Sequence, residues 1–158
     1  MATTTRNPEQ LDLTAWVTFL RAHSAITREM SNQLQREHGL TLHDYEVLLH
    51  LARSEYGMMR RVDLARNVLL TASGITRLLE GLERAGYVEK ATCESDARVS
   101  YAKLTEAGRT KLRAAGITHV RGVEELFTGR YSDSELETLA QLLARLPLVG
   151  AESSDCSV

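Results

Sequence analysis

Apolar positions along the 158-residue chain recur mostly at the spacing of an α-helix. In the first such stretch, Trp16, Leu20 and Leu34 share one helical face, which predicts a helix over 13–37 that Gly39 ends. The same pattern predicts five more helices, so the expected fold is mainly α. Their expected ranges are about 42–57, 62–68, 72–85, 106–128 and 133–146.

Capping residues precede several of these helices. Thr71 and Thr105 are of a type that accepts hydrogen bonds from the first helical turn, and Ser132 with Glu135 matches the S-x-x-E capping box. Asp44 is expected to favour the positive end of its helix, and Pro147 to close the last one.

The segment 87–104 departs from the helical pattern. Two stretches of alternating character, 87–93 and 99–104, flank a polar group at 94–96. This pattern predicts a small β-hairpin with Arg98 near its tip. A further short extended piece is expected at 58–60.

Composition limits the class of protein further. Apolar residues make up 43% of the chain, which is enough for a buried core. No apolar run reaches the length of a membrane span, and the start of the chain lacks the apolar stretch of a signal peptide, so a cytoplasmic location is expected. Cys93 and Cys156 lack the spacing of a disulfide framework or a zinc site, which predicts free thiols and no metal or other cofactor. No nucleophile–base pair, phosphate-binding glycine loop or useful carboxylate pair indicates an enzyme.

Charge is distributed unevenly along the sequence. The net charge of −2 argues against nucleic acid, yet residues 60–103 hold eight Lys and Arg against six Asp and Glu. A locally basic middle permits a nucleic-acid surface without establishing one.

The predicted helices 62–68 and 72–85 are separated by only a few residues, which is typical of a helix-turn-helix. Small or hydroxylated residues at the start of the second helix would let it approach DNA closely, and Arg77 could reach a guanine edge or a phosphate. The alternative is a solvated face of an ordinary helical domain. The candidate DNA contacts here are Arg61, Thr71, Ser73, Gly74, Thr76 and Arg77.

A hairpin directly after a helix-turn-helix predicts a winged helix. Arg98 at the hairpin tip could then enter a narrow minor groove, where the negative potential is strong. DNA would repel the carboxylate of Asp96, so a structural role is expected for it, either capping the turn or holding an arginine. The alternative is that Asp96 is only a turn residue and Arg98 only a solvated side chain.

Four motifs in a fixed order resemble the MarR family of bacterial transcriptional regulators. They are DLA at 63–65, SGITRLLEGLERAGYVE at 73–89, D-x-R formed by Asp96 and Arg98, and LTEAG at 104–108. The resemblance covers about residues 13–146 when the flanking helices are included. Many members carry a second arginine after the D-x-R motif, where this chain has Val99, so its wing is expected to rely more on Arg98.

The resemblance implies a homodimer that binds a pseudo-palindromic operator in double-stranded DNA as a repressor. It assigns 13–39 and 105–147 to dimerisation and 40–104 to a winged helix-turn-helix lobe. A flexible start at 1–12 and a disordered tail at 148–158 are expected beside them. The alternative for the flanking helices is a bundle within one chain, and the alternative function is a winged-helix module for protein–protein contact without DNA.

The resemblance also implies a response to a small molecule such as an aromatic or phenolic acid. Trp16, His23 and Tyr45 could line a crevice for it, with Arg21 or Arg28 as the counter-charge. Each of these side chains could equally belong to the core, an interface or the solvated surface. Redox sensing through Cys93 is not favoured, because no clear group nearby lowers its pKa.

Overall fold

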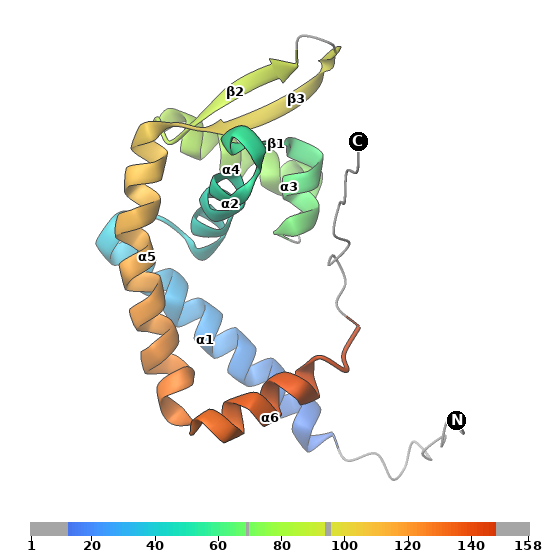
Figure 1. Ribbon diagram of the computed structural model, residues 1–158, viewed down its shortest axis with the longest axis vertical. Coiled ribbons are helices and arrows are strands. Elements are labelled where there is room, and N and C mark those ends of the chain that lie inside the picture. Colours follow the sequence, from blue (N-terminus) through green and yellow to red (C-terminus); the bar gives the residue numbers. More distant parts are fainter. Residues whose placement is uncertain (1–12, 69, 94–95, 148–158) are drawn as a thin grey trace, which may run out of the picture.

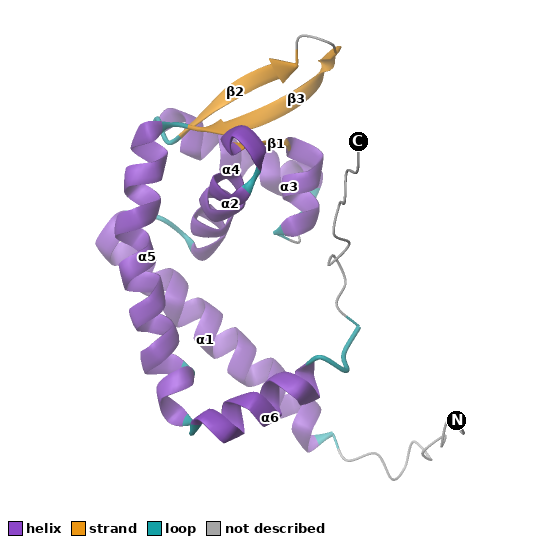
Figure 2. Cartoon of the chain, in the orientation of Figure 1, coloured by secondary structure: helices purple, strands orange, loops and turns teal. Residues whose placement is uncertain are grey.

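The computed structural model describes residues 13–68, 70–93 and 96–147, with only the backbone described at 93 and 96–98. Its order of elements confirms a mainly helical chain with one small sheet (Figures 1 and 2). Short 3-10 turns lie at Glu55–Gly57 and Thr128–Arg130. The helices are α1 (Thr14–His38), α2 (Leu42–Arg53), α3 (Arg61–Asn67), α4 (Ala72–Arg84), α5 (Glu106–Leu126) and α6 (Asp133–Leu143), and the strands are β1 (Met58–Arg60), β2 (Val88–Cys93) and β3 (Asp96–Leu104).

The elements form two regions that the long helix α5 connects (Figure 1). One region, the winged lobe, contains α2, α3, α4 and the sheet. In the other, α1 packs along α5, and α6 lies across the N-terminal part of α1. No described helix is both long and apolar enough to cross a membrane.

The sheet has three antiparallel strands in the order β1-β3-β2, so the expectation of a two-stranded hairpin was incomplete. Ala102 lies at the middle of the sheet, opposite Met59 on one side and Lys90 on the other, and is completely buried. The third strand is the extended piece expected at 58–60. Three residues are too few to show an alternating pattern, so its pairing partner could not be identified from the sequence.

Helix α2 begins where the sequence predicted and ends earlier. The backbone N–H of Asp44 donates to Thr41 Oγ1 over 3.1 Å, and the N–H of Thr41 donates to Asp44 Oδ2 over 2.8 Å. Asp44 therefore completes a capping box in addition to facing the positive helix end. The helix stops at Arg53, not near Gly57, because Ser54 already has extended backbone angles, with ψ at 156°. Tyr56 and Gly57 beyond it are left-handed, so the helix does not resume.

Helix α6 has the capping box predicted from Ser132 and Glu135. The hydroxyl and the backbone N–H of Ser132 both donate to Glu135 Oε2, and these hydrogen bonds hold the pKa of the Glu135 carboxyl below its ordinary value. The helix ends at Leu143, before the expected limit at 146, and Leu146 continues only as a tight turn bonded to Leu143. The shorter end agrees with the restriction that Pro147 places on the residue before it.

The core of the winged lobe joins all its helices to the sheet. Leu48 and Leu51 of α2, Leu64 of α3 and Leu79 of α4 have no exposed surface. Burying one such side chain contributes about 1.5–3 kcal/mol. Leu64, Ala65 and Val68 are buried on the inner side of the α3 segment, and Ile75, Leu79 and Leu82 on the inner face of α4.

A chain of polar contacts fastens the end of α1 to α5. The hydroxyl of Thr118, which is buried, donates to Glu37 over 2.8 Å, so it accepts from Nε2 of His38 at 2.8 Å. Arg121 pairs with the same carboxylate and is the main reason that the pKa of Glu37 lies below its ordinary value. His38, the last residue of α1, is half-buried where it meets Thr118.

The contact between α2 and α5 includes a ring stack. The rings of Tyr45 and His119 lie 4.5 Å apart and nearly parallel. Burial lowers the pKa of His119, and the nearby carboxylate of Glu46 opposes that shift. Burial also raises the pKa of the Tyr45 hydroxyl. Both rings are therefore held in their neutral forms at the junction of the two regions.

We predict that Gly108→Ala destabilises the protein. A Cβ at this position would lie 2.1 Å from the carbonyl oxygen of Tyr87 and 2.7 Å from Leu104 Cδ1, so the start of α5 must move off the sheet. The expected loss is about 1–3 kcal/mol in the free energy of unfolding, measured by urea denaturation. The control is Gly116→Ala in the same helix, where a Cβ meets nothing closer than Tyr45 Oη at 3.8 Å. That change should stabilise by about 0.5–1 kcal/mol, and equal effects of both variants would contradict the packing described.

We also predict that stability falls as the pH drops below the ordinary histidine pKa of 6.5. The unfolded chain protonates His119 there, whereas the folded chain resists protonation, so the stabilisation is present above pH 6.5 and is lost as the pH falls towards the lowered pKa. His119→Phe keeps a ring on Tyr45 and cannot titrate. Its urea midpoint should fall less than that of the wild type between pH 7.5 and 5.5, and identical pH dependence would exclude this role for His119.

Candidate nucleic-acid interface

Helices α3 and α4 form the helix-turn-helix that their spacing predicted. The turn is short and held by backbone hydrogen bonds, because the N–H of Val68 donates to Leu64 and that of Leu70 donates to Ala65. Both helices bury their apolar faces in the lobe, so the opposite face of α4 is turned to solvent.

The N-terminus of α4 is tightly organised around Thr71. The hydroxyl oxygen of Thr71 accepts a hydrogen bond from the N–H of Gly74 over 3.1 Å, and Ser73 Oγ lies 3.2 Å away. A Cβ at Gly74 would lie 3.2 Å from that hydroxyl oxygen, so glycine keeps the cap uncrowded. Thr76 donates its hydroxyl proton to the carbonyl of Ala72. Thr71 and Thr76 therefore shape the helix start, while Ser73 remains exposed.

Arg77 follows Ser73 by four residues, so the two side chains lie on one exposed ridge of α4. In the part of the chain that the structure describes, Arg77 makes no hydrogen bond or ion pair. A cation without an internal partner, one turn from a helix N-terminus, is available for an external anion or base edge.

Arg61 occupies a different setting from Arg77. Its guanidinium donates to Glu83 Oε1 over 3.0 Å, and only 21% of its side chain is exposed. Its Nε is buried with no hydrogen-bond partner in the structure. The sequence grouped Arg61 with the DNA contacts, and the structure shows it joined to a carboxylate of α4. No local pattern predicts this pair, because the two residues are far apart in the chain.

The wing is formed by β2 and β3, which project beyond the helices of the lobe (Figure 1). The pairing register changes between Thr92 and Cys93, where Cys93 pairs with Asp96 at the start of β3. Arg98 follows on the same strand. The side chains of Cys93, Asp96 and Arg98 lie outside the described part, so their predicted roles stay predictions.

The residues expected to bind a small molecule do not share one site. Trp16 and His23 line an open groove of about 1390 Å³ between α1 and α6, which we call the terminal-helix groove. Tyr45 lies instead at the junction of α2 with α5, stacked on His119. Arg21 and Arg28 are exposed and do not line the groove. The described residues contain no cluster of three His, Cys, Asp or Glu that could hold a metal.

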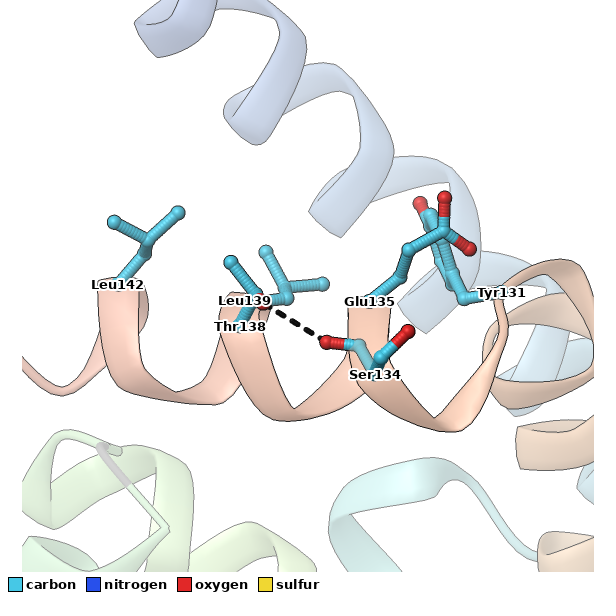
Figure 3. A pocket seen from close by; sticks show the side chains of 6 residues that line it. All are labelled: Tyr131, Ser134, Glu135, Thr138, Leu139 and Leu142. Carbon is cyan, nitrogen blue, oxygen red and sulfur yellow. Dashed lines mark hydrogen bonds between the residues drawn. The ribbon is translucent and has the colours of Figure 1, made fainter.

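The terminal-helix groove is mostly apolar and uncovered. Trp16 of α1 is 58% exposed, and Leu142 and Leu146 of α6 are each 48% exposed. Figure 3 shows Leu139 and Leu142 on α6 beside an adjoining hollow of about 380 Å³, which Tyr131 also lines. On α5, Ile117 is 73% exposed. Several large apolar side chains exposed on neighbouring helices form an unusually apolar surface for a single chain.

Comparison with known proteins shows which family has this architecture. The model of the MarR family matches residues 38–99. AbsC of Streptomyces coelicolor, a MarR family transcriptional regulator, is 33% identical with a TM-score of 0.78, and the match covers 88% of this chain and 93% of AbsC. Sco3205 of the same organism, a MarR family regulator solved in complex with DNA, is 29% identical with a TM-score of 0.78 over 87% and 89% of the two chains. MhqR of Bacillus subtilis, a helix-turn-helix transcriptional regulator, is 25% identical over 86% of this chain and 91% of its own.

The family match falls on the helix-turn-helix and the wing, and the structural likeness extends over the flanking helices. These are the motifs and the fold from which the resemblance was drawn. The chain belongs to the MarR family of helix-turn-helix transcriptional regulators, and not to a family of enzymes.

Proposed function

We propose that the protein is a homodimeric repressor that binds a pseudo-palindromic operator in double-stranded DNA. The observation that carries the proposal is the exposed ridge of Ser73 and Arg77 near the N-terminus of α4, the second helix of the helix-turn-helix. Such a helix lies in the major groove with its first turns against the base edges. Sco3205, which shares the fold, was solved bound to DNA, and this supports the same class of partner here.

Each residue at the start of α4 has a distinct proposed role. Thr71 and Gly74 form a compact cap that lets the backbone approach the duplex, and the helix N-terminus favours a phosphate. Ser73 and Thr76 are short enough for close contact. Arg77 reads a base edge, because a guanidinium can donate two hydrogen bonds to guanine.

The wing supplies the second contact in this proposal. Its strands project from the lobe, so the tip with Arg98 could follow the DNA backbone into the next minor groove (Figure 1). Asp96 would hold the turn and not touch DNA, since phosphates repel a carboxylate.

We predict that Arg77→Ala weakens binding to the operator by about 1–3 kcal/mol and relaxes preference at one position in each half-site. The removed guanidinium has no partner among the described residues, so the folded chain should keep its stability. Fluorescence anisotropy on operator variants at fixed salt measures both effects. An equal loss on every duplex would show a phosphate contact in place of base reading.

Arg98→Ala is the matched comparison, because it removes the same group from the wing. Its loss should be similar on all duplexes, and the slope of log affinity against log salt should become shallower by about one. Unchanged affinity and slope would exclude the proposed wing contact.

A second copy of the chain is the proposed cover for the terminal-helix groove. Its apolar walls come from α1 and α6, and residues 13–39 and 105–147 would form the dimerisation region beside a DNA-binding lobe at 40–104. A two-fold dimer sets two α4 helices about one turn of DNA apart, roughly 34 Å, which explains a palindromic target.

We predict that Leu142→Asp converts the dimer to monomers and abolishes tight operator binding. Leu142 is 48% exposed in the single chain, so the change should spare the fold of one chain while placing a charge in an apolar interface. Gln141→Asp is the control, since it adds the same carboxylate at the neighbouring exposed position of α6. Sedimentation velocity should show a monomer only for Leu142→Asp. A dimer in both variants would refute the interface.

Repression by covering a promoter and release by an aromatic or phenolic acid complete the proposal, and both rest on the family. Trp16 and His23 lie together in the terminal-helix groove, whereas Tyr45 lies apart, so a ligand could contact only the first two at once. The alternative function, a winged helix used only for protein contact, predicts that neither the wild type nor Arg77→Ala binds a duplex.

A further inference from the structure

Three charged side chains from three elements meet at the far end of α4. Glu83 lies in the last turn of α4, and its Oε1 is 3.0 Å from a guanidinium nitrogen of Arg61, the first residue of α3. Its Oε2 is 3.7 Å from Nζ of Lys90 on β2, the first strand of the wing. Only 18% of the Glu83 side chain is exposed, whereas Lys90 is 65% exposed. Glu83 thus connects the recognition helix to both of its neighbours.

In the Arg61–Glu83 pair, each charge is unfavourably placed with respect to the dipole of its own helix. A carboxylate in the last turn of α4 faces the negative end of the helix dipole, and a guanidinium at the start of α3 faces the positive end. Each placement is electrostatically unfavourable. The pairing between helices offsets both. It also accounts for an arginine whose Nε is buried without a partner, since the guanidinium is drawn inward by Glu83.

The Glu83 ion pairs lie where a small rotation of α4 would change how the helix-turn-helix and the wing meet DNA. Helix α4 packs on α3 and on β2, and Glu83 has an ion-pair partner on each. The outer ridge with Ser73 and Arg77 belongs to the same rigid helix. A change in the tilt of α4 at Glu83 would therefore shift the ridge and the wing relative to each other.

We infer that Glu83 is a positioning residue for DNA binding, which holds α4 at a fixed angle to α3 and to the base of the wing. Arg61 acts through Glu83 and does not contact DNA itself. The inference rests on the proposed DNA-binding function and deepens it.

The direction in which one substitution changes the affinity for DNA distinguishes a positioning role from a simple effect of net charge. Removing a carboxylate from a DNA-binding lobe lowers its repulsion from phosphates, so Glu83→Gln would tighten binding if only net charge mattered. If Glu83 positions α4, the same change weakens operator binding, by about tenfold, and lowers the preference for operator over unrelated DNA. The control is Glu80→Gln, an equal charge change at an exposed position of α4 with no ion pair among the described residues. It should bind as tightly as the wild type or more tightly.

The experiment measures affinity and salt dependence of full-length Glu83→Gln and Glu80→Gln on an operator fragment that the wild type retains. Circular dichroism and sedimentation check that each variant is folded and dimeric. A role in stability alone would lower the melting temperature and leave the affinity of the folded protein unchanged. Equal or tighter binding by folded Glu83→Gln overturns the inference and leaves DNA binding by the protein intact. A wild type that binds no duplex overturns the proposed function, and this inference with it.

If Glu83→Gln does not fold, the charge-swapped double variant Arg61→Glu with Glu83→Arg provides a second test of the inference. It preserves the ion pair between α3 and α4, and each new charge now suits the dipole of its own helix. Lys90 loses its partner, but its side chain is 65% exposed and can turn into solvent. Operator affinity within about threefold of the wild type is expected. If Arg61 instead contacts a phosphate, the swap places a carboxylate against DNA. The folded double variant should then bind the operator far more weakly than the single variant Arg61→Gln. That result would also overturn the inference.

Discussion

The burial of one face of α4 is the constraint on which the rest of the molecule depends. Ile75, Leu79 and Leu82 insert into a core shared with α2, α3 and the sheet, so the opposite face of the helix has to meet solvent. That face carries Ser73 and Arg77. The core thereby fixes the direction of the two side chains best suited to a major groove. The Thr71 cap and the Glu83 contacts then fix where the helix begins and how it is tilted.

A second constraint comes from apolar surface that one chain leaves uncovered. The walls of the terminal-helix groove belong to α1 and α6, while α5 connects that region to the winged lobe. Two neighbouring residues inside α5 contact the two regions, with His38 of α1 bonded to Thr118 and Tyr45 of α2 stacked on His119. Covering the groove with a second copy would set the distance between two lobes. The proposed dimer and the proposed operator are therefore consequences of the same geometry.

Much of this fold was predictable because local rules govern it. Helical periodicity located the α-helices of the described residues, and caps at Thr41, Thr71, Thr105 and Ser132 set the starts of four of them. The end of α2 was predicted too late because the extended Ser54 and the left-handed Tyr56 after it leave no periodic pattern. The pairing of β1 with β3 and the Arg61–Glu83 pair are long-range contacts, which have no periodic signature either. Among the candidate contacts, the ridge of α4 follows from periodicity, whereas the partner of Arg61 depends on how α3 and α4 pack.

Footprinting of the purified protein on fragments retained from its own genome tests the central claim most directly. Hydroxyl-radical cleavage should show two protected patches on one face of the duplex, centred about one helical turn apart, with two chains bound per site. Failure to retain any duplex at low ionic strength would contradict the account. So would a single protected patch occupied by one chain.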